Sequence, residues 1–432
     1  MNQTRHHWLR VHGRRMDSAL RNDLIRRLHL LRWMPCFLHR TALGVMESLT
    51  RVPVLIQLEA NRKKETGIVA AEHQALEFPV RRVFDNLGLY SCRLSLKQIK
   101  ELMERPEVSK IYLDRKVYAL LDTAAPATRA PLVWEAENQG EGVTIAVVDT
   151  GIDPHPDLTR PNNRIVAFKD FVGGLTKPYD DNGHGTHVAG CAAGNGYASD
   201  GKYRGTAPRA RLVGVKVLDK TGAGNLSDVI AGIKWCIDNR DRYNIRIISL
   251  SLGSPPSGSY RDDPVCRVVE EAWNHGITVI AAAGNSGPEA GTISSPGNHP
   301  RIITVGASDD NETADPGNDT IASFSSRGPT ADGVVKPDLI APGVEITSLR
   351  VPGSYLDKMS ADNRTGQYLT LSGTSMSTPL VSGIAALILS AHPELDPDQV
   401  KQKLLSTARD LGFSPNEQGK GLVDAFRAVS AE

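Results

Sequence analysis

The chain has 432 residues, of which 40% are apolar and 23% charged, a composition ordinary for a soluble globular protein of two or three domains. Its 50 basic and 49 acidic residues nearly cancel to a formal net charge of +1, which excludes a strong overall attraction to nucleic acid or to a membrane surface. The 5 cysteines are odd in number and include no C-x-x-C pair, which argues against a disulfide framework or a structural zinc site and favours reduced thiols in a reducing compartment.

Residues 1–50 form a strongly basic N-terminal extension. An amphipathic pattern places Met16, Leu20, Leu24, Leu28 and Leu31 on one helical face, with arginines largely around it. Such a helix could bind a membrane surface or a partner. The favoured interpretation is a helix that packs on the rest of the chain and leaves its basic face in solvent.

The same N-terminal region carries no uninterrupted apolar core of about 7–15 residues, as a secretion signal requires. No apolar run in the chain reaches the length of a membrane-spanning helix. We therefore expect a cytoplasmic protein without a transmembrane segment and without a nucleic-acid partner.

Residues 51–122 show alternating strand and helix signals. Strands are predicted over 54–58, 82–84, 89–94 and 110–121, and helices over 67–76 and 96–103. This β-α-β-β-α-β order is typical of a small α+β domain. The Ala- and Pro-rich residues 123–132 predict a linker.

Residues 133–432 alternate short apolar strands with helices. The strands are predicted over 143–149, 211–218, 245–252, 277–284 and 301–307, and the helices over 184–194, 225–239, 264–275, 374–391 and 397–408. Near-continuous apolar strands indicate a buried parallel sheet, so the fold class is α/β, a doubly wound parallel sheet with helices on both faces. Active groups in such sheets collect at the carboxyl ends of the strands.

Three segments combine polar residues of catalytic type with the ends of apolar elements. Asp149 ends the apolar run 145–149, His184 lies in Asn-Gly-His-Gly-Thr-His, and Ser375 lies in Gly-Thr-Ser-Met-Ser before an apolar helix. A serine hydroxyl needs a nearby base, and that base needs a group that fixes its tautomer. Ser375, His184 and Asp149 supply these three roles.

A fourth role is stabilisation of the negative charge that forms on the substrate carbonyl oxygen. Asn285 follows another apolar strand and can donate its side-chain amide, and the backbone N–H of Ser375 is the second candidate donor. The helix that begins near Ser375 adds the positive end of its dipole.

The three motifs in the order Asp, His, Ser, the Asn285 segment and the run 336–343, Lys-Pro-Asp-Leu-Ile-Ala-Pro-Gly, closely resemble the subtilisin-like serine proteases, the subtilase family, and among them the intracellular subtilases of bacilli. The resemblance covers about residues 133–432. One departure follows the nucleophile, where Ser377-Thr378-Pro379 replaces the commoner Ala-Ser-Pro.

The resemblance implies a serine endopeptidase that hydrolyses protein or peptide substrates through an acyl-enzyme intermediate, without a cofactor for catalysis. It places the substrate strand between two backbone segments. The implied substrate-binding residues are Gly222, Gly224, Ser251, Leu252, Gly253, Ala283 and Gly284, with Ser294 near the base of the main specificity pocket. No charge lines that pocket, so we expect a broad or apolar preference.

The resemblance also implies that residues 51–122 are propeptide-like, acting as a folding template and an intramolecular inhibitor that is cut near residues 118–135. Structural calcium is common in the family, and Asp157 matches a position that supplies a ligand. Asp157 as a lone exposed carboxylate is the alternative, and both interpretations stay open because six to eight oxygen ligands cannot be assembled from the sequence.

Other interpretations of these motifs fit the sequence less well. His187 is expected to be a packed helix residue, since His184 and His187 lack the Glu of a zinc-binding H-E-x-x-H motif. Asp149-Thr150-Gly151 would suit an aspartic protease, but a second such motif is absent from the sequence. An α/β-hydrolase would need Gly-x-Ser-x-Gly and the order Ser, acid, His. The non-enzyme alternative is a catalytically inactive peptide-binding module.

Overall fold

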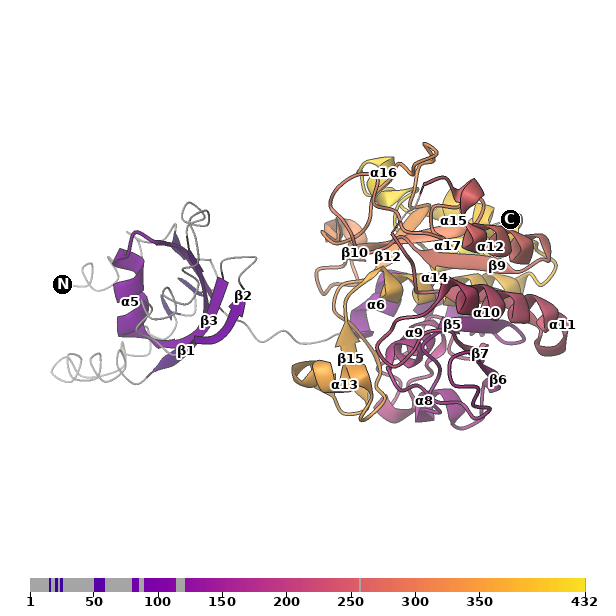
Figure 1. The fold of residues 1–432 in the computed structure, drawn as a ribbon, viewed down its shortest axis with the longest axis horizontal. Helices are drawn as coiled ribbons and strands as arrows, with labels where there is room; N and C mark the ends of the chain where they lie inside the picture. The colour runs from indigo at the N-terminus through magenta and orange to yellow at the C-terminus, as the bar shows by residue number, and fades with distance from the viewer. Residues whose placement is uncertain are drawn as a thin grey trace. The chain divides into compact units, whose positions relative to one another are not determined.

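The computed structural model describes residues 15–16, 20–21, 24–25, 50–58, 80–84, 89–113, 121–255 and 258–431. The chain divides into two compact units, Met1–Val117 and Tyr118–Glu432 (Figure 1). We describe each unit by itself.

The small unit contains a four-stranded antiparallel sheet in the order β2-β3-β1-β4. Its strands are β1 (Arg51–Leu58), β2 (Val80–Phe84), β3 (Leu89–Ser95) and β4 (Val108–Leu113). Helix α5 (Leu96–Glu104) begins at a capping box of Ser95 and Gln98, which satisfies two backbone donors at its N-terminus. The predicted α+β element order agrees with these elements, while the helix predicted over 67–76 lies outside the described residues.

The start of the chain contributes to the core of this unit. Met16, Leu20 and Leu24 are buried in the same apolar cluster as strand β1 and helix α5. The Arg15 guanidinium donates a hydrogen bond to the carbonyl of Met103 at 2.8 Å. Where the structure describes the amphipathic pattern, its apolar face is therefore packed inside the unit. The rest of that pattern, Leu28 and Leu31, lies outside the described residues.

The predicted linker over 123–132 differs from the structure. Helix α6 (Leu121–Ala127) and helix α7 (Ala130–Glu135) occupy it, and Ala124 and Val133 are buried in the core of the large unit. The prolines suggested irregular structure, but α7 has its proline at the first turn, where no hydrogen bond is lost. The small alanine side chains allow both helices to pack closely.

The large unit is built on an eight-stranded sheet in the order β11-β10-β9-β8-β5-β7-β6, with β12 pairing β10. Its five predicted strands are present as β5 (Thr144–Asp149), β7 (Arg211–Lys216), β8 (Ile245–Leu250), β9 (Thr278–Ala282) and β10 (Ile303–Asp309). They pair in parallel, and β5 lies between β7 and β8 near the middle. The α/β prediction is confirmed.

Three strands of this sheet were not predicted: β6 (Ile165–Asp170), β11 (Thr320–Ile321) and β12 (Leu339–Pro342). Strand β6 is an edge strand with partly exposed middle residues, and β11 is only two residues long and runs antiparallel to β10. Strand β11 is too short to show a pattern, and in β6 the apolar residues 165–168 are followed directly by Lys169 and Asp170.

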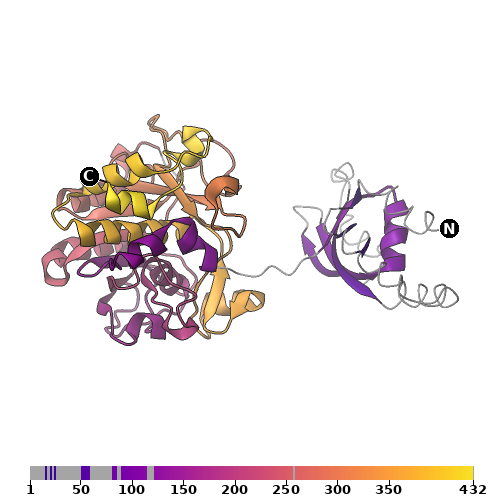
Figure 2. The ribbon, with the colours of Figure 1, turned by 180° about the vertical axis from the view of Figure 1, so that it is seen from behind.

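Helices cover the sheet on both faces. The five predicted helices are α9 (His184–Ala193), α10 (Leu226–Asp238), α12 (Pro264–Asn274), α14 (Thr374–Ala391) and α15 (Pro397–Thr407). Figure 1 shows α10 and α12 on the near side of the large unit, and Figure 2 shows the yellow C-terminal helices from the other side. Helices α9 and α14 pack against each other and against central strands.

Contrary to the expectation that no apolar run reaches the length of a membrane-spanning helix, α14 is long and apolar enough by length and composition, with a mean hydropathy of 1.4. However, 83% of this stretch is buried inside the unit. Its packing on the sheet accounts for its apolar composition.

A second, three-stranded antiparallel sheet was also not predicted. Its strands are β13 (Ile346–Leu349), β14 (Arg364–Thr365) and β15 (Tyr368–Leu371), in the order β13-β15-β14. Helix α13 (Tyr355–Met359) lies in the connection between β13 and β14. Strand β15 leads directly to the turn that begins α14 and therefore places Ser375.

The described cysteines agree with the expectation of reduced, buried thiols. Cys92, Cys191, Cys236 and Cys266 are all free and buried. Burial raises the pKa of the Cys92 thiol to about 11 and that of Cys191 to about 12, so both thiols stay protonated near neutral pH. Cys36 lies outside the described residues.

Candidate active site

The topology of the large unit brings the three motif residues to one edge of the sheet. Asp149 is the last residue of the central strand β5, His184 is the first residue of α9, and Ser375 is the second residue of α14. Because carboxyl ends of parallel strands lie at the same edge, this is where side chains from several strands can meet.

Asp149 and His184 are in direct contact. The Nδ1 atom of His184 lies 2.7 Å from Oδ1 of Asp149, and the backbone N–H of Thr150 donates to the same oxygen at 2.7 Å. The Asp149 side chain is fully buried, while about a fifth of the His184 side chain, 21%, is exposed. A carboxylate at Nδ1 holds the proton on that nitrogen, which leaves Nε2 as the acceptor facing the cleft.

A second buried carboxylate, Asp180, shapes the turn before His184. It accepts hydrogen bonds from the backbone N–H groups of Asn182 and Gly183, from the hydroxyl of Thr150, and from both the backbone and hydroxyl of Thr186. Sequence reasoning missed this residue. The pattern that could have identified it is an aspartate just before the first turn of α9, because the positive end of the helix dipole favours a negative charge there.

The charge around His184 determines when it can act as a base. Burial opposes ionisation of the imidazole, but the Asp149 carboxylate and, more weakly, Asp180 outweigh burial and raise the pKa of His184 above its ordinary value. The free protein therefore holds a proton on His184 up to a higher pH than an isolated histidine would.

We expect this raised pKa to set the acid limb of the rate profile. A protonated His184 cannot accept a proton, so kcat/KM should fall as the pH drops through the pKa of the free enzyme. That limb should lie above 6.5, the ordinary histidine value. The measurement is kcat/KM for one uncharged peptide across a pH series. A limb centred below 6.5 would contradict the electrostatic argument.

Ser375 lies next to the segment that carries Ser251. Its hydroxyl donates to the carbonyl oxygen of Ser251 at 3.1 Å, and the Ser251 hydroxyl donates to the carbonyl of Ser375 at 2.9 Å. The hydroxyl therefore has to turn about its Cα–Cβ bond to bond to His184. Hydrogen bonds of catalytic groups often tighten only when substrate is bound.

Asn285 is oriented by Thr374. The Oδ1 atom of Asn285 accepts from the backbone N–H of Thr374 at 2.9 Å and from its hydroxyl at 3.0 Å. The other end of the amide, Nδ2, faces Gly373: a Cβ atom added there would lie 3.2 Å from Nδ2 and 3.7 Å from the backbone nitrogen of Ser375. Two donors thus border one space, which exists because residue 373 has no side chain. Sequence reasoning missed both Gly373 and Thr374.

We expect the substitution Gly373→Ala to fill the space between these donors. Its methyl group would exclude a carbonyl oxygen from Asn285 Nδ2 and Ser375 N, so kcat should fall on the order of 10²–10³-fold, the usual effect of losing one oxyanion-hole donor. Asn285→Ala should give a loss of the same order. The measurement is kcat for each variant after the folded fraction has been matched by circular dichroism.

The double variant Gly373→Ala/Asn285→Ala should have a kcat only slightly below that of either single variant, because both substitutions remove the contact between Asn285 Nδ2 and the substrate oxygen. Unchanged kcat in Gly373→Ala would show that the substrate oxygen binds elsewhere.

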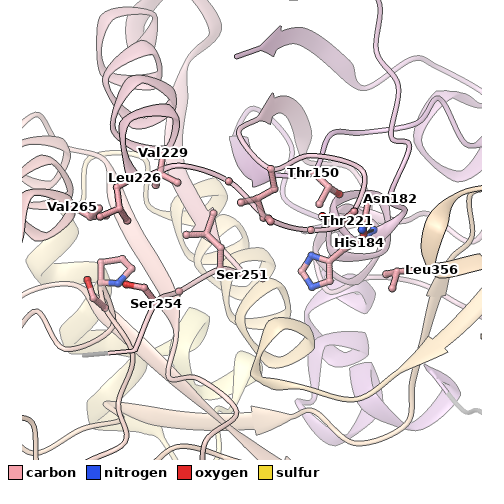
Figure 3. A pocket seen from close by; sticks show the side chains of 18 residues that line it. Thr150, Asn182, His184, Thr221, Leu226, Val229, Ser251, Ser254, Val265 and Leu356 are labelled. Atoms are coloured by element: carbon pink, nitrogen blue, oxygen red, sulfur yellow. Dashed lines mark hydrogen bonds between the residues drawn. The ribbon is translucent and has the colours of Figure 1, made fainter. Parts of the chain in front are cut away.

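Two cavities extend from these residues. One, of about 480 Å³, runs from His184 along the two segments predicted to hold substrate. Figure 3 shows Leu226, Val229 and Val265 at one end of it, and His184 and Leu356 at the other. The other, of about 240 Å³, is bordered by Ser375, Asn285 and Ser294. His184 is the only titratable side chain that lines either cavity among the described residues.

Most of the predicted substrate-binding residues line these cavities. Gly222 and Gly224 line the first, Gly284 lines the second, and residues 251–253 line both. Ala283 does not: it is fully buried, and its backbone N–H donates to Val305. Because side chains alternate along an extended segment, its neighbours Ala282 and Gly284 line the second cavity, and the assignment of Ala283 to substrate binding stays a prediction.

His187 is a packed helix residue, as predicted. It is fully buried, and its Nε2 atom lies 3.1 Å from the carbonyl of Ile346 and 3.0 Å from that of Leu369. Burial first, and then the charge of nearby His184, lowers the pKa of His187 to about 3, so it stays neutral. It ties α9 to strands β13 and β15.

Asp157 is buried, and each of its carboxylate oxygens accepts a hydrogen bond from the protein. Its Oδ1 accepts from the backbone N–H of Ala198 at 2.8 Å, and its Oδ2 from the Tyr368 hydroxyl at 2.9 Å. The buried Arg164 guanidinium donates to its backbone carbonyl. Calcium needs several oxygens that are free to turn toward it. The surroundings of Asp157 therefore do not fit a calcium site. Its burial also excludes the alternative interpretation, an exposed carboxylate.

Comparison with known proteins gives consistent matches. The model of the subtilase family matches residues 140–422. The chain is 45% identical over 438 residues to "Serine protease AprX" of Bacillus subtilis (strain 168), covering 98% of both chains. It is 37% identical over 357 residues to "Subtilisin E" of the same strain, covering 81% of this chain and 83% of that one. An "Alkaline protease" of Alkalihalobacillus alcalophilus is 35% identical, covering 86% and 87%.

Proposed function

Because the chain belongs to the subtilase family and is a serine endopeptidase that acts on proteins or peptides, we propose that Asp149, His184 and Ser375 are the residues that carry out the cleavage. The observation that carries this assignment is the 2.7 Å contact between buried Asp149 and Nδ1 of His184. Ser251, whose carbonyl accepts a hydrogen bond from the Ser375 hydroxyl, lines the same cavity as His184.

The proposed reaction proceeds through an acyl-enzyme. The Ser375 oxygen attacks the peptide carbonyl carbon while Nε2 of His184 takes the hydroxyl proton. His184 then gives that proton to the leaving amine as the peptide C–N bond breaks, and a water molecule later hydrolyses the ester by the same route. Asp149 holds the imidazole tautomer and stabilises its cation, and Asn285 Nδ2 with the Ser375 N–H binds the oxyanion.

A fluorophosphonate probe tests this assignment, since an activated serine displaces its fluoride and becomes phosphonylated. The full-length protein is labelled and the modified peptide is identified by mass spectrometry. Label on Ser375 that disappears in His184→Ala would support the triad. Label on another serine, or equal labelling in both proteins, would overturn it.

The two cavities support a broad or apolar preference around the cleaved bond, since no Asp, Glu, Lys or Arg is among the residues that line them. The lining of the larger cavity includes Leu218, Leu226, Leu252, Val229 and Val265. Burying such surface is favourable by about 25 cal/mol per Å², whereas a buried charge without a partner is costly. Sequencing the fragments of an unfolded protein substrate tests this. Cleavage mainly after Lys or Arg would contradict it.

The small unit is proposed to be an intramolecular inhibitor that is removed by self-cleavage. This proposal is supported by the position of the small unit before the peptidase unit in the sequence and by its own apolar core. Ala124 and Ala130 are fully buried, so the cut should precede Ala124 rather than fall anywhere within 118–135. Intact masses of wild type and Ser375→Ala test this. The proposal fails if neither chain, or both chains, are shortened there.

A further inference from the structure

Helix α13, a short element that sequence reasoning did not predict, is attached to the loop that precedes His184. The backbone N–H of Tyr355 donates to the carbonyl of Asp181 at 3.0 Å, and that of Leu356 donates to the carbonyl of Asn182 at 2.9 Å. The first turn of α13 thereby lies against the two residues that precede Gly183, the residue that caps the N-terminus of α9.

Helix α13 is also held from its other side, by a buried carboxylate. Asp357, only 3% exposed, accepts hydrogen bonds from the Arg350 guanidinium at 2.5 Å and from the backbone N–H of Gly353 at 2.8 Å. The Arg364 guanidinium lies 2.8 Å from the same carboxylate. Since Arg350 follows β13 and Arg364 begins β14, these contacts fix α13 to the three-stranded sheet and give its side chains defined positions.

One side chain of this helix enters the cleft. Leu356 lines the larger cavity together with His184, Asn182 and Thr150, as Figure 3 shows. Leu218 and Thr221 border the same cavity. By contrast, Met359 on the same helix is 69% exposed and does not line the cavity. The helix therefore presents one apolar side chain to the space beside the candidate base.

We propose that Leu356 is a specificity-determining residue, an apolar wall that selects apolar substrate side chains close to the scissile bond. The inference rests on the proposed triad, because the bond that is cut must lie between Ser375 and His184. A substrate side chain that touches Leu356 is then within two residues of that bond. Side chains at Leu226, Val229 and Val265, at the far end of the cavity, are further along the substrate.

The alternative role for α13 is purely structural, as a support for the loop before His184. The two roles differ in what Leu356 does to substrates. A supporting residue affects all substrates equally, whereas a wall changes the ratio of kcat/KM between substrates that differ at one position. A gain or loss of one methylene in an apolar pocket changes such ratios by about 10–200-fold.

The test compares Leu356→Ala and Leu356→Glu with wild type on fluorogenic peptides varied singly at the three residues on each side of the cut. At one position within two residues of the bond, Leu356→Glu should raise the Lys-to-Leu ratio of kcat/KM about tenfold or more. Leu356→Ala should admit larger apolar residues at that same position. Met359→Ala is the matched control and should leave all ratios unchanged, while Leu226→Ala should change a more distant position.

A uniform change across all peptides in both Leu356 variants, or a change only at distant positions, would overturn the inference. Its failure is distinguishable from failure of the proposed triad. If wild type cleaves the peptides but Ser375→Ala cleaves them equally well, the triad is wrong. If Ser375→Ala is inactive and the Leu356 variants keep wild-type ratios, only the specificity role is wrong.

Discussion

Replacing Ser375 with alanine is expected to lower kcat for peptide hydrolysis about 10⁶-fold, a magnitude carried over from the nucleophile of subtilisin, a relative. The structure gives the reason for so large a loss. Ser375 lies in the first turn of α14, its backbone nitrogen borders the same space as Asn285 Nδ2, and no acyl-enzyme can form without its side-chain oxygen.

The measurement is kcat with a saturating fluorogenic peptide, using protein that has been freed of traces of wild type. Ser377→Ala is a suitable control, since Ser377 is fully buried, its hydroxyl donates to the carbonyl of Pro342, and it lines neither cavity. The variant Ser375→Ala should unfold at the same temperature as wild type, because a single half-exposed hydroxyl is lost. A fall in kcat of less than tenfold would exclude Ser375 as the nucleophile.

Asp149→Asn is expected to lower kcat about 10⁴-fold, by analogy with the corresponding change in serine proteases. The carboxylate accepts from Nδ1 of His184 at 2.7 Å in a site without solvent exposure. An amide can present its NH₂ group there instead, which favours the tautomer with the proton on Nε2. In that tautomer His184 cannot accept the proton of Ser375.

The same variant should move the acid limb of kcat/KM to lower pH. Asp149 is the main group that raises the pKa of His184, so its neutral replacement leaves burial, which lowers the pKa, less opposed. Rate profiles of Asp149→Asn and of Asp241→Asn, an exposed carboxylate on another helix, separate this effect from a general change in charge. A limb that stays at the wild-type pH would contradict the assignment of Asp149 as the partner of His184.

The strands and helices that were predicted from the sequence share strong apolar patterns. Strand β5 and helix α14 are almost wholly buried, so nearly every residue in them had to be apolar or small. Asp149 and Ser375 stood out as polar residues at the ends of such runs. Strand β6 was missed because its middle residues are partly exposed, and the strands β13, β14 and β15 were missed because they are short.

The parts of the site that could not be predicted depend on contacts between segments that are distant in the sequence. Nothing near Leu356 in the sequence indicates that it borders the same cavity as His184, which lies 172 positions earlier in the chain. The role of Gly373 likewise depends on where Asn285 lies. The motifs identify the reacting groups, whereas the shape of the cavity around them depends on how distant segments of the chain pack together.

The contacts of Asp157 have a consequence for how the protein depends on its medium. A bound metal ion stabilises a fold by mass action, so its contribution rises and falls with the concentration of the free ion. Here the donors are the Ala198 N–H, the Tyr368 hydroxyl and the Arg164 guanidinium, all covalently part of the chain. Their local concentration is constant. We therefore expect the contacts around Asp157 to keep their stabilisation when a chelator removes divalent cations from solution.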